Sequence, residues 1–137
     1  MKAKSIKGNS PEDIQASLEK KLADGFKPSL AIVFLSMQHD REAITALLDK
    51  EGISIFGATT HGEFIDEDLG KGSIAILLMD INPDYFTILF AEYPEKNYRE
   101  VAGEIARKAK HLFSHPAFLL SGSHMETDAE QLLFGFE

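Results

Sequence analysis

Side chains that can contact a ligand gather in three short segments, residues 36–40, 59–63 and 121–126, each placed after an apolar run. These segments contain hydroxyl groups, carboxylates, glycines and three of the five histidines of the chain. Glycine permits close approach of the backbone to a bound molecule, and convergent donors and acceptors orient a polar ligand. We therefore predict a ligand-binding site made by Ser36, Thr59, Thr60, His61, Gly62, Glu63 and Ser123. The alternative is that these segments are polar only because they turn into solvent.

The sequence lacks the patterns that mark common catalytic centres. The nucleophile turn G-x-S-x-G is missing. Ser123 and His124 are neighbours in the sequence, and such neighbours rarely have the geometry of a triad. The segment 70–73 does not meet the Walker spacing, and we expect a strand after it where a phosphate loop requires a helix. We therefore predict no catalytic residues and a function that is not enzymatic.

Metal and cofactor binding have little support in the sequence. There are no cysteines, which excludes disulfides, thiolate nucleophiles, Cys-ligated zinc and iron–sulfur clusters. His61 and Glu63 form a possible pair of ligands, but the remaining ligands have to come from other segments. We predict no metal site and no cofactor.

Composition also limits which kinds of partner we expect the chain to bind. The formal net charge is -8, from 22 acidic and 14 basic residues, and the basic residues are scattered, so we expect no nucleic-acid binding. No apolar run approaches the roughly 18 residues that span a bilayer, and no apolar region follows the N-terminal lysines as in a secretory signal. We therefore expect a cytoplasmic protein without a membrane partner.

The elements that would position the ligand-binding residues alternate along the chain. A helix is predicted to begin at Ser10, with a serine cap and proline in its first turn, and a second helix at Asp40. The apolar runs Leu30–Leu35 and Ile53–Ala58 predict strands buried in a sheet. Ser73–Asp80 predicts a further strand.

The second half of the chain is predicted to hold a hairpin, two helices and one more strand. The short connection after Asp80 favours an antiparallel hairpin with a strand at Tyr85–Glu92. Helices are expected at Asn97–Ser114 and from Glu126, with a strand at Ala117–Leu120 between them. The sequence thus predicts one α/β domain over residues 1–137: a mixed, largely parallel sheet with helices packed on its faces and one β-hairpin. Parallel strands near residues 30, 55 and 118 would bring the three polar segments to one edge of that sheet.

One segment resembles a known family. Residues 55–64, read as IFGATTHGEF, and the apolar strand that follows Gly70 and Gly72 resemble the N-terminal part of the FIST sensory domain. That family has a strand ending in a G-x-[ST]-[ST]-x-G-E turn, then a variable loop, a glycine and an apolar strand. His61 occupies a place where the family often has a small residue.

The resemblance implies an intracellular sensory domain in signal transduction that binds small molecules such as amino acids; some family members are haem proteins that sense nitric oxide. Family members usually carry a second, C-terminal half. One alternative is a protein-interaction module, assembling as a homo-oligomer or with a partner chain. The apolar residues for that contact are Leu132, Leu133, Phe134 and Phe136. The other alternative is a haem or metal protein that uses His61 or His124.

Overall fold

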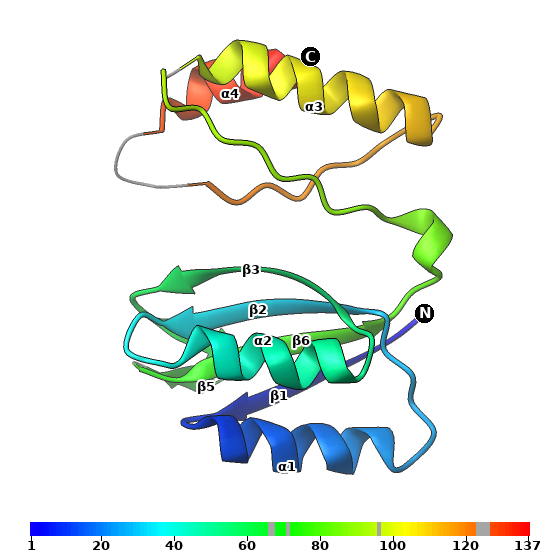
Figure 1. Cartoon of the computed structure of the whole chain (residues 1–137), viewed down its shortest axis with the longest axis vertical. Coiled ribbons are helices and arrows are strands. Elements are labelled where there is room, and N and C mark those ends of the chain that lie inside the picture. Colours follow the sequence, from blue (N-terminus) through cyan, green and yellow to red (C-terminus); the bar gives the residue numbers. More distant parts are fainter. Residues whose placement is uncertain (66–67, 71, 96, 123–126) are drawn as a thin grey trace. The chain divides into compact units, whose positions relative to one another are not determined.

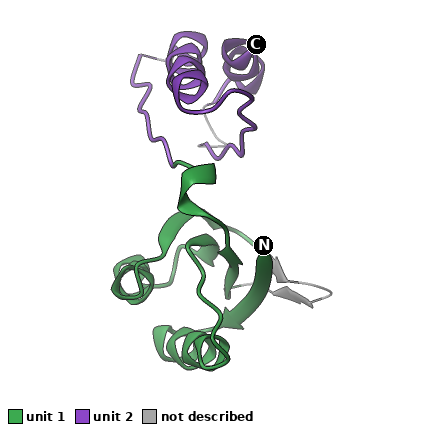
Figure 2. Ribbon diagram, turned by 90° about the vertical axis from the view of Figure 1, so that its right-hand side faces the viewer, with its two compact units in different colours: residues 1–87 green, residues 88–137 purple. Residues whose placement is uncertain are grey.

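The computed structural model describes residues 1–65, 68–70, 72–95, 97–122 and 127–137. Contacts divide the chain into two compact units, residues 1–87 (unit 1) and residues 88–137 (unit 2), which Figure 2 colours separately. That residues 1–137 act as a single domain stays a prediction.

Unit 1 is built on a four-stranded sheet. Its strands are β1 (Lys2–Gly8), β2 (Leu30–Ser36), β3 (Ser54–Thr60) and β6 (Ile74–Asp80), in the order β1-β6-β2-β3 (Figure 1). β2 runs parallel to β3, whereas β6 is antiparallel to both β1 and β2. The predicted mixed α/β sheet is therefore confirmed. The sheet is not largely parallel as the sequence predicted, because β2 and β3 form its one parallel pair.

Two helices cover one face of the sheet, as Figure 2 shows: α1 (Pro11–Leu22) and α2 (Arg41–Lys50). Both begin where the sequence predicts, because the side chains of Ser10 and Asp40 accept hydrogen bonds from backbone N–H groups of the first turn. The residue Gly25 follows α1 and Gly52 follows α2, and each has a positive φ, the left-handed backbone that ends a helix.

Alternation along β2 separates the two faces of the sheet. Ala31, Val33 and Leu35 are buried, and they form one core with Ile14 and Leu18 of α1 and with residues of α2 and β6. The other face is also apolar but less covered. Phe34 is 40% exposed on it, and register places this side chain beside Ala58 and Ala75.

The predicted hairpin is wrong. Among the described residues after β6, the chain forms the short 3-10 helix η1 (Pro83–Tyr85) and then runs without a strand. β6 has no free edge for a hairpin partner, because β1 occupies one side and β2 the other. The hairpin-like pair of unit 1 instead joins β4 (Glu63–Ile65) and β5 (Asp68–Gly70).

Unit 2 contains the helices α3 (Tyr98–Leu112) and α4 (Ala129–Phe136), and both were predicted. They approach closely at Ala102, Gly103 and Gly135, where a Cβ atom on Gly135 would lie 2.4 Å from the Ala102 Cβ. The strand predicted at Ala117–Leu120 is not formed in the structure. Its Phe118 ring packs instead against Phe136, with 4.7 Å between the ring centroids. None of the described helices is long and apolar enough to cross a membrane.

Candidate functional site

Two of the three predicted polar segments meet in unit 1. Parallel pairing places Ser36, the last residue of β2, beside Thr60, the last residue of β3. The turns that follow therefore leave the same edge of the sheet, and we call residues 36–40 and 59–63 the rim. Ser121, from the third segment, lies in unit 2, and the candidate Ser123 lies outside the described residues, as does His124.

Glu63 is the most buried polar residue of the rim, with 1% of its surface exposed. Its Oε1 accepts a hydrogen bond from the Thr60 hydroxyl at 2.6 Å. Its Oε2 accepts two more, from the Ser73 backbone N–H at 3.0 Å and from the Ser73 hydroxyl at 3.2 Å. These bonds satisfy the carboxylate and tie the end of β3 to the start of β6.

The hydrogen bonds to Glu63 also set its charge state. Burial alone would raise the pKa of this carboxyl, because it disfavours the ionised form. The bonds from Thr60 and Ser73, together with the nearby charge of His39, favour the ionised form and outweigh burial, so the pKa lies below the ordinary value. Glu63 is therefore a buried anion held mainly by neutral donors.

His39 and Gly72 complete this end of the sheet. The His39 Nε2 lies 2.9 Å from the Gly72 carbonyl oxygen. Because a carbonyl only accepts, Nε2 is the donor in this hydrogen bond. Gly72 has a φ of 71°, and a Cβ there would lie 2.4 Å from the Nε2 of Gln38. The two turns of the rim are thus fixed against the entry to β6.

The other predicted ligand residues stay accessible. Thr59, His61 and Gly62 are exposed, whereas Ser36 and Thr60 are half-buried. The Thr60 hydroxyl donates its hydrogen to Glu63, but its oxygen can still accept a hydrogen bond. The rim can therefore offer hydroxyl groups, an imidazole and glycine backbone to a small polar molecule; that these residues bind one stays a prediction.

The rim does not fit a metal or haem site. Within the described part of the chain, no three histidine, aspartate or glutamate side chains gather to hold a metal ion. His61 is exposed at a turn, whereas a haem iron takes its axial ligand from within an enclosing pocket.

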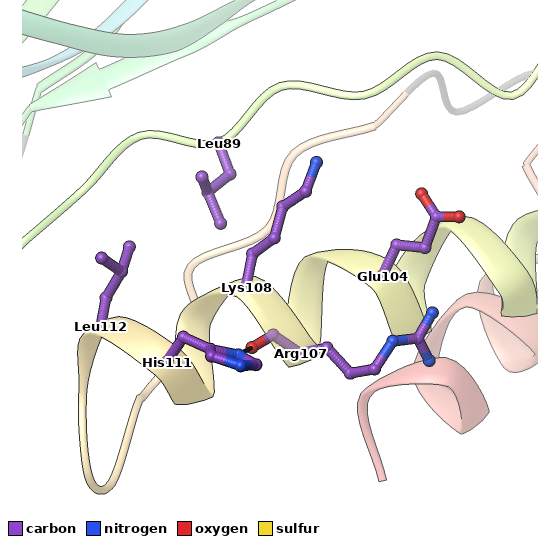
Figure 3. A pocket seen from close by; sticks show the side chains of 6 residues that line it. All are labelled: Leu89, Glu104, Arg107, Lys108, His111 and Leu112. Atoms are coloured by element: carbon purple, nitrogen blue, oxygen red, sulfur yellow. Dashed lines mark hydrogen bonds between the residues drawn. The ribbon is translucent and has the colours of Figure 1, made fainter.

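Unit 2 has a groove that the sequence did not reveal. It measures about 510 Å³ and runs between α3 and the extended segment that carries Leu89 (Figure 3). Its lining comprises Leu89, Glu104, Arg107, Lys108, His111 and Leu112. The His111 Nδ1 lies 2.7 Å from the Arg107 carbonyl oxygen, so this ring is held against its own helix. The groove is open, and its polar side chains do not converge on one point in Figure 3.

Sequence reasoning also missed Ser73 and Gly72 as hydrogen-bond partners of the rim. They precede β6, a strand predicted as an element but not as a neighbour of the turn after β3. The glycine before an apolar run was the available signal, since a positive φ at that place favours glycine. The pairing of Glu63 with Ser73 depends on the fold, and spacing alone does not show it.

The family comparison covers the part of the chain that contains the rim. The sequence description of the FIST N domain matches residues 29–137, which include β2, β3, the rim and β6. No curated protein and no solved structure matches the chain. FIST domains are known as sensory domains. Because the match covers more than half of the sequence, the chain belongs to the FIST N domain family.

Proposed function

We propose that the chain is a non-enzymatic sensory domain in signal transduction that binds a small polar molecule at the rim. The observation that carries this proposal is the register of Ser36 with Thr60, which aligns the ends of two parallel strands and the turns after them. Ligands of open α/β sheets commonly bind beyond the carboxyl ends of parallel strands. Membership of a family of sensory domains supports the same function.

The contacts divide into two groups by accessibility. Thr59, His61 and the Gly62 backbone are exposed and would touch the ligand, with Ser36 and Thr60 at its edge. Glu63 is buried and its oxygens already accept three hydrogen bonds, so we assign it a positioning function. A molecule with both donors and acceptors, such as an amino acid, suits exposed hydroxyl and imidazole groups.

A thermal-shift screen with single amino acids tests the proposal. Ligand that binds the folded chain raises the melting temperature by mass action. We expect a shift for at least one amino acid, and we expect Thr59→Val and His61→Ala each to reduce it. Thr45→Val is the matched control, because Thr45 is an exposed threonine of α2 outside the rim.

The result that contradicts the proposal is equally direct. If an amino acid stabilises the Thr59→Val, His61→Ala and Thr45→Val variants as much as the unchanged protein, binding does not use the rim. If no amino acid shifts the melting temperature at any concentration, this class of ligand is wrong.

A second candidate function is protein binding through α4. Leu133 and Phe134 are 58% and 39% exposed, so part of the predicted apolar surface faces outward in the structure. Leu132 and Phe136 are half-buried, and Phe136 packs on Phe118, which leaves Leu133 and Phe134 as the residues available for a partner. Such exposed apolar side chains are typical of interaction surfaces when they lie side by side.

Light scattering tests this second function. We expect a double variant, Leu133→Asp with Phe134→Asp, to lose any self-association that α4 supports while keeping its helical circular dichroism. An unchanged mass for both proteins at all concentrations would remove self-association through α4.

A further inference from the structure

Within the described residues of unit 1, the outer edge of β3 has no paired strand. β3 ends the sheet order β1-β6-β2-β3, with β2 on its inner side. In the described part of the chain, no strand pairs with its other side. Ser54, Gly57 and Thr59 along this strand are exposed. An edge strand of this kind presents a row of backbone donors and acceptors to its surroundings.

Hydrogen bonding identifies which backbone groups face outward. The Ser54 N–H donates to the Ser29 carbonyl oxygen at 2.9 Å, so Ser54 points its backbone groups toward β2. Because the backbone groups of successive residues in a strand face opposite sides, the N–H and C=O of Ile55, Gly57 and Thr59 point away from β2. These three residues form the free edge.

The two edges of the sheet differ in their charges. β1, at one edge, carries Lys2, Lys4 and Lys7, and lysine is a residue that proteins use to keep an edge strand from pairing with other chains. β3, at the other edge, reads Ser-Ile-Phe-Gly-Ala-Thr-Thr and has neither a charged residue nor a proline. Because β3 lacks the charged residues and prolines that protect edge strands, its composition is that of an inner strand.

We propose that β3 is an interaction edge that pairs antiparallel with β3 of a second copy of this chain. In the register centred on Gly57, Gly57 lies opposite Gly57 of the copy, and Ile55 lies opposite Thr59 of the copy. All of these are outward-facing residues, so each opposed pair can exchange N–H···O=C hydrogen bonds in both directions. The register thus uses the whole free edge and obeys twofold symmetry.

The absence of charge on β3 removes a local obstacle to pairing with a second copy. The chain carries a formal charge of -8, so two copies repel each other over most contacts. The β3 edge is an uncharged strip, and pairing it with itself brings no like charges opposite one another. A charged peptide would find no opposite charge on this strand. Since the remaining repulsion is long-ranged, added salt should tighten the dimer.

Sedimentation of the full chain over a concentration series, at low and high salt, tests the proposal. We expect a monomer–dimer equilibrium that shifts toward dimer with salt. Thr59→Pro removes one outward donor without touching the bonds to β2, and we expect it to raise the dissociation constant about tenfold or more. Thr59→Val keeps that N–H and is the matched control, which should dimerise normally.

A second pair of variants covers the case in which Thr59→Pro disturbs the fold. Ser54→Lys places a lysine on the β3 edge. Ala3→Lys places one on the β1 edge, in the same row of the sheet, because register joins Ala3, Met79, Leu30 and Ser54. We expect the first to weaken the dimer and the second to leave it unchanged.

Three outcomes would overturn the proposal. The first is a monomer at every concentration and salt, including a monomer whose Ile55, Gly57 and Thr59 amides are protected from hydrogen exchange, since the edge is then covered within one chain. The second is a dimer that both Thr59→Pro and Ser54→Lys leave intact. The third is a dimer lost in the Leu133→Asp, Phe134→Asp variant, which would locate the contact on α4.

Discussion

Glu63 and Asp24 are carboxylates near opposite ends of β6, and the pKa of each lies below its ordinary value. Glu63 sits by Ser73, just before β6 begins, and is buried among neutral donors. Asp24 is 61% exposed and pairs with Lys4 of β1, a strand whose Lys2 is the register partner of Asp80 at the end of β6. Glu63 is held mainly by neutral donors, whereas Asp24 is held mainly by the Lys4 cation, with the Phe26 N–H as a second donor.

This difference means that Glu63 supports the fold, whereas Asp24 forms a pair at the surface. The Glu63 partners are parts of strands and turns, so losing the carboxylate leaves a buried N–H and hydroxyl groups without an acceptor. For Asp24, the hydrogen bond from Lys4 is the main cause of the lowered pKa, and water can replace that partner. Although the pKa of both carboxyls is lowered, we therefore expect the loss of Glu63 to destabilise the fold more than the loss of Asp24.

The largest expected effect comes from Glu63→Ala. Removing the buried carboxylate leaves the donors of Thr60 and Ser73 without an acceptor. Hydrogen bonds to charged groups contribute about 1.5 to 3 kcal/mol each. We expect the free energy of unfolding to fall by about 3 kcal/mol, measured by urea denaturation. Glu63→Gln is the matched control, because its amide can accept from Ser73 and donate to the Thr60 oxygen. Equal losses in the two variants would show that the hydrogen bonds do not matter.

Acid should reveal the same contrast. A carboxyl whose folded pKa lies below its unfolded pKa of about 4.3 stabilises the fold fully above that unfolded value. This stabilisation is lost as pH falls through the lowered folded pKa, because protons then bind the unfolded chain first. We expect Glu63→Gln to flatten the loss of stability below about pH 5, even in high salt. A profile identical to that of the unchanged protein would mean that Glu63 does not carry this dependence.

Two glycines, one at each end of the sheet, allow the same comparison with a smaller expected effect on stability. Gly72, beside Glu63's partner Ser73, and Gly25, beside Asp24, both have a positive φ. A Cβ on Gly25 meets open space, whereas a Cβ on Gly72 meets the mobile end of the Gln38 side chain. We expect each glycine-to-alanine change to cost about 1 kcal/mol, from the left-handed backbone. A much larger loss at Gly72, measured by the same denaturation, would show that Gln38 is fixed at the rim.

Local signals in the sequence predicted the helices well. Ser10 and Asp40 bond to N–H groups only three residues away, so the sequence contains both partners of each cap side by side. The parallel alignment of β2 with β3 was also expected, since α2 connects them and a helical connection between neighbouring strands favours parallel pairing.

Pairing between distant segments could not be predicted in the same way. β1 was missed because three lysines interrupt its apolar residues, and its partner β6 lies more than 60 residues later in the chain. The same β6 edge was assigned to a hairpin with Tyr85–Glu92, which the structure shows to be wrong. Glu63 was predicted as a ligand contact from its place in a polar turn, but its burial depends on Ser73, which the fold brings to it.

The smallest expected effect belongs to Asp24. Its hydrogen bond and charge interaction with Lys4 are largely exposed to solvent, and screening and side-chain entropy reduce what such a pair contributes. Lys4 also lies 4.8 Å from the centre of the Phe26 ring, a contact that survives when Asp24 is changed. We therefore expect Asp24→Asn to shift the urea midpoint slightly at low salt and not at all in 1 M salt. The Phe26 N–H also donates to the Asp24 Oδ1, at 3.2 Å. A shift that persists in salt would show that Asp24 depends on this backbone donor more than on Lys4, and the contrast between the two ends of β6 would fail.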